Sequence, residues 1–384
     1  MTERLSALLR QEAAALDIPP VDHDAILGRG HQARTRRRAT AFLAVAAAAV
    51  VAVVGAGTAL GPGGSDKGRD EKVTDSVVSD GPSRGVVAYG AGSTVVVDGT
   101  TATVPDTVRS LHYTSVGVLT LSNPNPGWGP ENLTLITSDG SATDLGTIPE
   151  RVLPATDPDE PVYALAEESG DGFRVVVRDA LTGVEVGSRD LPDLPMSYWP
   201  LPPLALDGDI VYAGFEDEAY ALNWRTGEMQ PAAGLAGGMP QVRGGFAVSY
   251  GEKLIEGGVL ELVVSVVNAA TGASALVVPL EQGAYGTGSL SPDGKYLRFG
   301  NEPGVNKNGD LVVPDSVDVY DIASGGRVRI SGDVNGWGWT SGGFLVRVEG
   351  TSIGICDPLT GRCTTESGPR VGNDVRLAGN SYES

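Results

Sequence analysis

The chain is poor in the residues that most often carry out chemistry. Its 384 residues include 2 cysteines and 3 histidines, and only one histidine, His112, lies beyond residue 31. This count excludes a histidine-rich metal site in residues 61–384, and any serine–histidine–aspartate triad there would have to use His112. We therefore predict no catalytic, cofactor-binding or metal-binding residues; calcium on paired loop carboxylates is conceivable, but no twelve-residue calcium loop supports it.

Positive charge is also scarce. The chain has 28 lysines and arginines against 48 aspartates and glutamates, which gives a net charge of −20. Residues 1–61 carry seven arginines and five acids, so the excess of acid lies entirely in the remainder. A domain this acidic repels a phosphate backbone, so we expect no nucleic-acid partner. Arginine far outnumbers lysine, and alanine, glycine and valine are frequent, which favours a bacterial source.

One long uncharged run stands out, the 22 residues from Ala39 to Leu60. As a helix it would span about 33 Å, enough to cross a hydrocarbon core of about 30 Å. Cationic residues precede the run, whereas charge of both signs follows it. The positive-inside rule then predicts a single transmembrane helix at 39–60, with a cytoplasmic N-terminus and residues 61–384 outside the cell membrane. The cations are Arg29, Arg34, Arg36, Arg37 and Arg38.

Two alternatives to this anchor remain open. A cleaved signal peptide would have a basic region of some 38 residues, which is longer than usual. A twin-arginine export signal is suggested by Arg36 and Arg37, but Phe42 and Leu43 lie too far from them for a good match. Under the anchored interpretation, residues 1–38 form a cytoplasmic tail and the polar, glycine-rich residues 61–85 form a flexible linker.

A hairpin signature recurs along residues 86–384. Five segments share the pattern Asp/Asn, two residues, Thr/Ser, Gly, and two shorter Asp-Gly pairs precede them. The Asp or Asn side chain can accept bonds from its own turn, and glycine tolerates the positive φ that such a turn requires. The seven glycines are Gly99, Gly140, Gly183, Gly227, Gly272, Gly325 and Gly361.

The spacing of these glycines predicts the fold class. The intervals are 41, 43, 44, 45, 53 and 36 residues, and the longest contains an expected insertion near 301–310. A period of about 40–45 residues filled with short strands is typical of an all-β β-propeller, with one four-stranded blade per repeat. We predict seven blades over residues 86–384, with six or eight as alternatives and a β-sandwich as the competing fold. Ring closure by a strand near 85–89, added to a last blade at 343–366, is expected because it leaves no open sheet edge.

Two repeats resemble known propeller families. The segment 208–230 contains Val211-Tyr212, then Tyr220-Ala-Leu-Asn223 and Thr226-Gly227, which resembles the pyrroloquinoline-quinone-like repeat. The turn Ser291-Pro-Asp-Gly294 resembles that of WD40-like propellers of the TolB type. The resemblance implies a propeller. It does not imply a quinone, since no matching calcium or base residues are present.

The two cysteines flank the last of these turns. Cys356 and Cys363 would lie opposite each other across the hairpin, at a separation that suits a disulfide. An exported domain meets the oxidising conditions that such a bond needs.

The sequence favours a membrane-anchored binding or scaffold module for a protein, peptide or glycan. Loop faces of such folds usually carry function, and three tryptophans in glycine- and proline-rich segments, Trp199, Trp337 and Trp339, are candidate contacts or, alternatively, packing residues. An exported metal-dependent hydrolase or lactonase is a second hypothesis. A sensor that signals through the helix to the N-terminal tail is a third.

Overall fold

The computed structural model describes residues 84–379, apart from 126–128, 171, 197–198, 236–237, 255–259, 281–285, 302–303, 306–310, 313 and 334–335. The chain divides into two units, Met1–Ser76 and Val77–Ser384, and all described residues belong to the second. The predicted transmembrane segment 39–60 lies outside the described residues. None of the described residues forms a helix long and apolar enough to cross a membrane.

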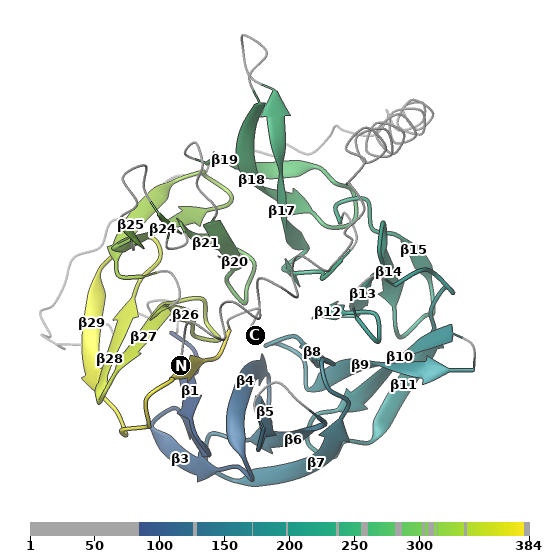
Figure 1. Ribbon diagram of the computed structural model, residues 1–384, viewed down its shortest axis with the longest axis horizontal. Coiled ribbons are helices and arrows are strands. Elements are labelled where there is room, and N and C mark those ends of the chain that lie inside the picture. Colours follow the sequence, from purple (N-terminus) through teal and green to yellow (C-terminus); the bar gives the residue numbers. More distant parts are fainter. Residues whose placement is uncertain are drawn as a thin grey trace, which may run out of the picture. The chain divides into compact units, whose positions relative to one another are not determined.

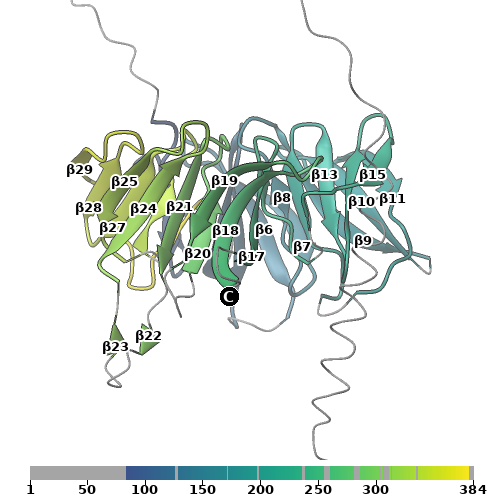
Figure 2. The same cartoon turned by 90° about the horizontal axis from the view of Figure 1, so that it is seen from above.

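The described part of the chain is a seven-bladed β-propeller, which confirms the predicted fold class and blade number (Figure 1). Seven antiparallel sheets of four strands surround one axis, and the side view shows them as a flat ring (Figure 2). In each of blades 2 to 7, the strand that comes first in the sequence lies nearest the axis, and the strand that comes last lies on the rim.

Blades 2, 3 and 4 each use four strands that are consecutive in the chain. Blade 2 contains β4 (Thr107–Thr114), β5 (Gly117–Asn123), β6 (Glu131–Ile136) and β7 (Ala142–Ile148). Blade 3 contains β8 (Ala155–Thr156), β9 (Val162–Ser169), β10 (Gly172–Asp179) and β11 (Glu185–Asp190). Blade 4 contains β12 (Leu204–Asp207), β13 (Ile210–Gly214), β14 (Ala219–Asn223) and β15 (Met229–Pro231). Segment 208–230, which carried the family resemblance, therefore spans the outer three strands of blade 4.

Blades 5 and 7 follow the same plan, whereas blade 6 contains the predicted insertion. Blade 5 contains β16 (Val242–Arg243), β17 (Phe246–Leu254), β18 (Leu260–Asn268) and β19 (Ser274–Pro279). Blade 6 contains β20 (Gly286–Leu290), β21 (Tyr296–Asn301), β24 (Ser316–Asp321) and β25 (Arg327–Ser331), with the two-stranded insertion β22 (Gly304–Val305) and β23 (Leu311–Val312). Blade 7 contains β26 (Gly338–Trp339), β27 (Leu345–Glu349), β28 (Ser352–Cys356) and β29 (Cys363–Ser367).

Blade 1 closes the ring and corrects one expectation. It combines β1 (Ala88–Ala91), β2 (Thr94–Val97) and β3 (Thr100–Thr103) with the C-terminal β30 (Arg376–Leu377). The pairs Tyr89–Leu377 and Gly90–Arg376 join the two ends of the propeller in one sheet. The predicted closure had the N-terminal strand completing the last blade; instead, blade 7 is complete in itself and the C-terminal strand completes the first blade.

The hydrophobic core is divided among the seven interfaces between adjacent blades. Because successive side chains of a strand point to opposite faces of its sheet, each blade packs against both neighbours. In β5, for example, Val118 packs toward blade 1, whereas Leu119 and Leu121 pack toward blade 3. Seven clusters of buried residues result, one per interface, and each depends on the blade on either side of it.

All seven predicted glycine turns connect the third and fourth strands of a blade. Each of the seven glycines has a positive φ, between 67° and 85°. In blade 3, Asp179 Oδ1 accepts hydrogen bonds from the backbone N–H of Leu181 and Thr182, and Gly183 N–H donates to the Asp179 carbonyl at 2.8 Å. The turns that begin at Asn223, Asn268, Asp321 and Asp357 repeat the backbone bonds and the side-chain bond. We call the side of the ring that carries these turns the hairpin face.

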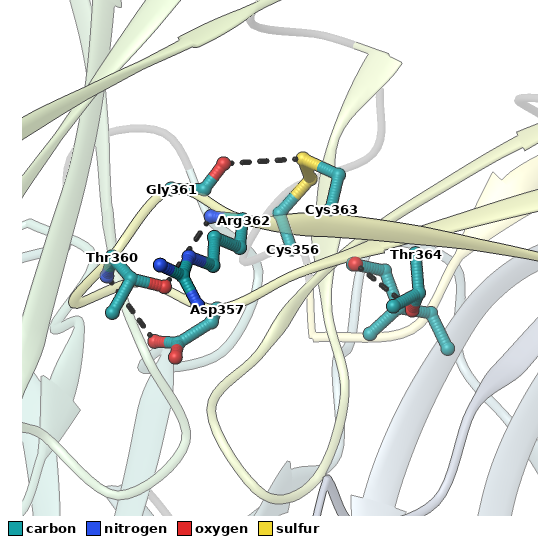
Figure 3. The surroundings of a disulfide bond; sticks show 8 residues. Cys356, Asp357, Thr360, Gly361, Arg362, Cys363 and Thr364 are labelled. Carbon is teal, nitrogen blue, oxygen red and sulfur yellow. Dashed lines mark hydrogen bonds between the residues drawn. A yellow bond between two sulfur atoms is a disulfide. The ribbon is translucent and has the colours of Figure 1, made fainter.

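The last of these turns carries the predicted disulfide. Cys356 and Cys363 are paired residues of β28 and β29, their Cα atoms are 4.0 Å apart, and their sulfur atoms are bonded (Figure 3). Cys356 is fully buried between blades 6 and 7, whereas Cys363 is exposed on the rim strand. The bond therefore joins the rim strand of blade 7 to the packed part of the sheet.

Replacement of both cysteines by serine is expected to destabilise the propeller by about 2–3 kcal/mol, because the short closed loop no longer restricts the unfolded chain. Denaturant unfolding of the double variant Cys356→Ser/Cys363→Ser against the wild type measures this. Because Cys356 is buried, serine there adds a cost of its own, so the reduced wild-type protein isolates the effect of the bond. Equal stability of the oxidised and reduced wild type would show that the bond contributes nothing.

Candidate functional site

The inner strands enclose a cavity of about 100 Å³ near the axis of the ring. Side chains from five of these strands, β4, β8, β12, β16 and β20, line it, together with Gly379 just after β30. The neighbouring inner strands contact one another, β8 with both β4 and β12, and β12 with β16. No single blade makes this cavity, so it exists only when the ring is assembled.

Most of the residues that line the cavity are apolar, and prolines are frequent among them. Six prolines contribute to the lining: Pro154, Pro158, Pro202, Pro203, Pro240 and Pro292. Proline has a fixed φ and no N–H group, so these segments form a rigid wall that adds no backbone donor of its own. A mainly apolar wall with a few placed polar groups is the usual composition of a ligand site.

The polar groups of the cavity are basic or neutral. Arg243, Arg151, His112, Gln241 and Thr156 all line it. No aspartate or glutamate is among the lining residues that the structure describes. In a chain with 48 acidic residues, this absence sets the cavity apart from the rest of the described surface.

Arg243 ends β16 and is held by two backbone carbonyls. Its Nη1 donates to the carbonyl oxygens of Leu206, at 3.3 Å, and Val242, at 3.0 Å. Burial lowers the pKa of Arg243, and the carboxylates of Asp157 and Asp207 offset part of that effect. A guanidinium keeps its proton in such an environment, so the cavity contains a fixed positive charge.

Asp157 and Asp207 connect neighbouring blades on the hairpin face. Asp157 follows β8, and its Oδ2 accepts a 2.6 Å bond from the N–H of Gly208 in blade 4. Asp207 ends β12, and its two carboxylate oxygens accept bonds of 2.8 and 2.7 Å from the N–H groups of Gly244 and Gly245 in blade 5. These carboxylates fix the positions of β8, β12 and β16, from which Thr156 and Arg243 reach the cavity.

His112, the lone histidine beyond residue 31, lies in β4 and lines the cavity. Its Nε2 is 2.9 Å from Ser110 Oγ. Burial lowers its pKa to about 4, and the positive charge of Arg243 adds to this effect. The imidazole is therefore neutral at pH 7 and can serve as both hydrogen-bond donor and acceptor.

A second cavity, of about 480 Å³, adjoins the first between blades 2 and 3, and the two share Val152, Ala166 and Leu201. It has acidic residues, Glu167 and Glu168, in its lining. Glu167 is already paired with Arg178 at 2.9 Å and with Arg174 at 2.8 Å. Glu167 is thus matched by two arginines, whereas no acidic residue is among the described lining residues of the axial cavity, so we take the axial cavity as the better candidate for recognition.

The three candidate tryptophans separate into two kinds of position. Trp199, in the connection between β11 and β12, is half-buried and lines the axial cavity. Trp337 and Trp339 are only 4% and 0% exposed and pack between blades 6 and 7. Trp339 Nε1 donates to Ser289 Oγ at 3.1 Å, which ties blade 7 to blade 6. Both residues thus take the packing role that the sequence left as the alternative.

Arg243 and Gln241 were not predicted from the sequence. Both lie in a short stretch without a recognisable motif, and Arg243 is one of 23 arginines in the chain. No cluster of three or more histidine, cysteine or acidic side chains suited to a metal ion occurs among residues 84–379 where they are described.

No protein-family model and no curated protein matches the chain. Solved structures that resemble it include the hydrazine synthase of Kuenenia stuttgartiensis, with a TM-score of 0.41 and 16% identity over 65% of this chain and 76% of that chain. TolB from Acinetobacter baumannii has a TM-score of 0.39 and 12% identity over 78% and 67%. A chain of the mitotic checkpoint complex has a TM-score of 0.39 and 13% identity over 67% and 79%. Similarity this weak decides nothing about function, and the fold assignment rests on the strand pairing.

The lowered pKa of His112 predicts a loss of stability in acid. The unfolded histidine takes up a proton near pH 6.5 but the folded one only near pH 4, so its stabilising contribution is complete above pH 6.5 and is lost as the pH falls to about 4. The loss is expected to reach about 1–3 kcal/mol. Because carboxylates titrate in the same range, the measurement is the difference in unfolding free energy between wild type and His112→Gln at pH 7.5 and pH 4.5. A difference that does not change with pH would contradict an imidazole that stays neutral in the folded protein.

Proposed function

We propose that this protein is a membrane-anchored, extracytoplasmic binding module that engages a protein or peptide partner through the axial cavity of its propeller. The observation that carries the proposal is the composition of that cavity: an apolar, proline-rich wall, a fixed positive charge at Arg243, and no acidic side chain among its described lining residues. Arg243 lies on an inner strand and is held by two backbone carbonyls, so this charge is in position before a partner arrives.

A macromolecular partner fits the cavity better than a free small molecule. Pockets for small ligands usually measure about 300–1,000 Å³, whereas this cavity is about 100 Å³. It can take one side chain or chain end, with the rest of the partner lying outside. Trp199 and Arg151 line the same cavity and are half-buried and exposed, respectively, which suits contact with such a partner.

The anchored location rests on the sequence and is supported by the disulfide. Residues 39–60 are uncharged and follow a cluster of arginines. The disulfide between Cys356 and Cys363 is a bond that forms and persists in oxidising compartments. Membrane attachment would also concentrate the propeller at the cell surface, where exported proteins and peptides pass.

Fractionation of the native cells tests the location. The full-length chain should stay with alkaline-washed membranes, and a variant without residues 39–60 should be released. Protease added to intact spheroplasts should degrade the propeller and spare a tail fragment. A soluble native protein whose amino terminus begins beyond Leu60 would contradict the anchor.

Partner capture from the native cell envelope, with the full-length chain as bait, tests the binding function. Trp199→Ala and Gln241→Ala are expected to weaken retention of the specific partner about tenfold, because each removes a contact group from the cavity. Gln230→Ala, the same change on the exposed rim strand β15, is the matched control and should bind as the wild type does. Equal retention by all variants would place the binding surface elsewhere.

A further inference from the structure

The charge of the axial cavity has no counterpart within it. Arg243 and Arg151 are cationic, and no acid is among the described lining residues. Arg151 is largely exposed and lies 3.6 Å from Glu150, so its charge is partly matched and screened. The charge of Arg243 lies deeper and is the one that a bound group would meet.

The Arg243 guanidinium retains donors for a ligand. Both hydrogen bonds that it donates to described residues start from Nη1. These two bonds fix the plane of the group, while Nε and Nη2 form no hydrogen bond within the described part of the chain. A guanidinium presents its N–H groups as a planar fork that matches the two oxygens of a carboxylate.

The nearest carboxylates cannot take that place. Asp157 and Asp207 influence Arg243 electrostatically, but the hydrogen bonds that Arg243 donates to described residues go to backbone carbonyls and to neither carboxylate. Asp157 is bonded to Gly208 and Asp207 to Gly244 and Gly245, in bonds that connect blades. Moving either carboxylate to Arg243 would break those inter-blade contacts.

We infer that the axial cavity binds a carboxylate carried on a short apolar stem, with Arg243 as the principal donor. The inference rests on the proposed function, and it names the chemistry of the partner's inserted group: an acidic side chain or a C-terminal carboxylate. The volume of about 100 Å³ is smaller than the roughly 150 Å³ of a cavity that holds benzene, so it suits a carboxylate with a few methylene groups better than a ring. The proline-rich wall contacts the stem, and neutral His112 and Gln241 offer further hydrogen bonds.

Butyrate and its neutral isostere butyramide are the probes for this inference. The ring resonance of His112 in the full-length protein, assigned by its loss in His112→Gln, reports occupation of the cavity. At pH 7 butyrate is expected to shift this resonance saturably and to bind at least about tenfold more tightly than butyramide. Arg243→Gln should remove that preference, and Arg243→Lys should retain part of it because the charge remains without the fork.

Arg362→Gln, in the exposed turn between β28 and β29 and outside the cavity lining, is the control for a general effect of positive charge, and it should change butyrate binding less than about threefold. Equal binding of butyrate and butyramide, or no shift with either at millimolar concentration, would overturn the inference. So would a butyrate preference that persists in Arg243→Gln.

Two capped peptides distinguish the sources of the carboxylate. One peptide has a glutamate and an amidated C-terminus, and the other has a glutamine and a free C-terminus. The peptide that displaces butyrate identifies the inserted group. If neither peptide displaces butyrate, the assignment of the carboxylate to a peptide is overturned. The proposed function and the carboxylate inference can fail separately. If partner capture depends on Trp199 and Gln241 while butyrate shows no preference, the binding function stands and the carboxylate inference fails.

Discussion

The structure depends on the pairing of two strands from opposite ends of the propeller. β30 contributes only Arg376 and Leu377, yet it pairs with β1 and completes the first blade from the last residues of the ring. Ala378 N–H donates to the Ala88 carbonyl at 3.0 Å, and Leu377 packs with Tyr89 between blades 7 and 1. Without this sheet, the interface between blades 7 and 1 would lose one of its walls. Because the core consists of seven such interfaces, opening one exposes apolar surface that no other part of the ring covers.

The axial cavity is a consequence of that closure. Two of the inner strands that line the cavity, β8 and β16, have only two residues each. So few backbone pairs within a blade do not fix the positions of β8 and β16 by themselves. The carboxylates of Asp157 and Asp207 supply the missing constraint by bonding N–H groups of the next blade. Two of the many acidic side chains thus hold a cationic group near the axis without forming an ion pair with it.

The repeat was predictable because its signal is local. Asp or Asn accepts bonds from its own turn and glycine provides the positive φ, so the seven turns, the blade number and the insertion near 301–310 can be inferred from residue spacing. Even the Asp98-Gly99 pair, which lacks the full five-residue pattern, is a two-residue turn, since Asp98 and Gly99 have φ values of 51° and 83°. The disulfide was predictable for the same reason, because its cysteines face each other across one of these turns.

The closure and the cavity were not predictable, because both depend on residues far apart in the chain. Nothing in Arg376-Leu377 indicates a strand, whereas the apolar segment at 85–89 suggests one plainly, so the wrong terminus was assigned to the closing position. Arg243 meets His112 only through the ring, across 131 residues. The tryptophans show the same limit: Trp199 lines the cavity while Trp337 and Trp339 are buried, although all three occur in similar glycine- and proline-rich surroundings.

The central claim is that a closed ring, joined by its C-terminal strand, forms the axial cavity. Hydrogen–deuterium exchange of the intact protein tests this most directly at the two amides that join the termini, those of Gly90 and Ala378. In a ring closed in this way, both amides are expected to exchange as slowly as those of the second strands of blades 3 and 4, because they open only when the ring opens. Exchange of Ala378 at the rate of an unfolded chain, while those strands stay protected, would contradict it.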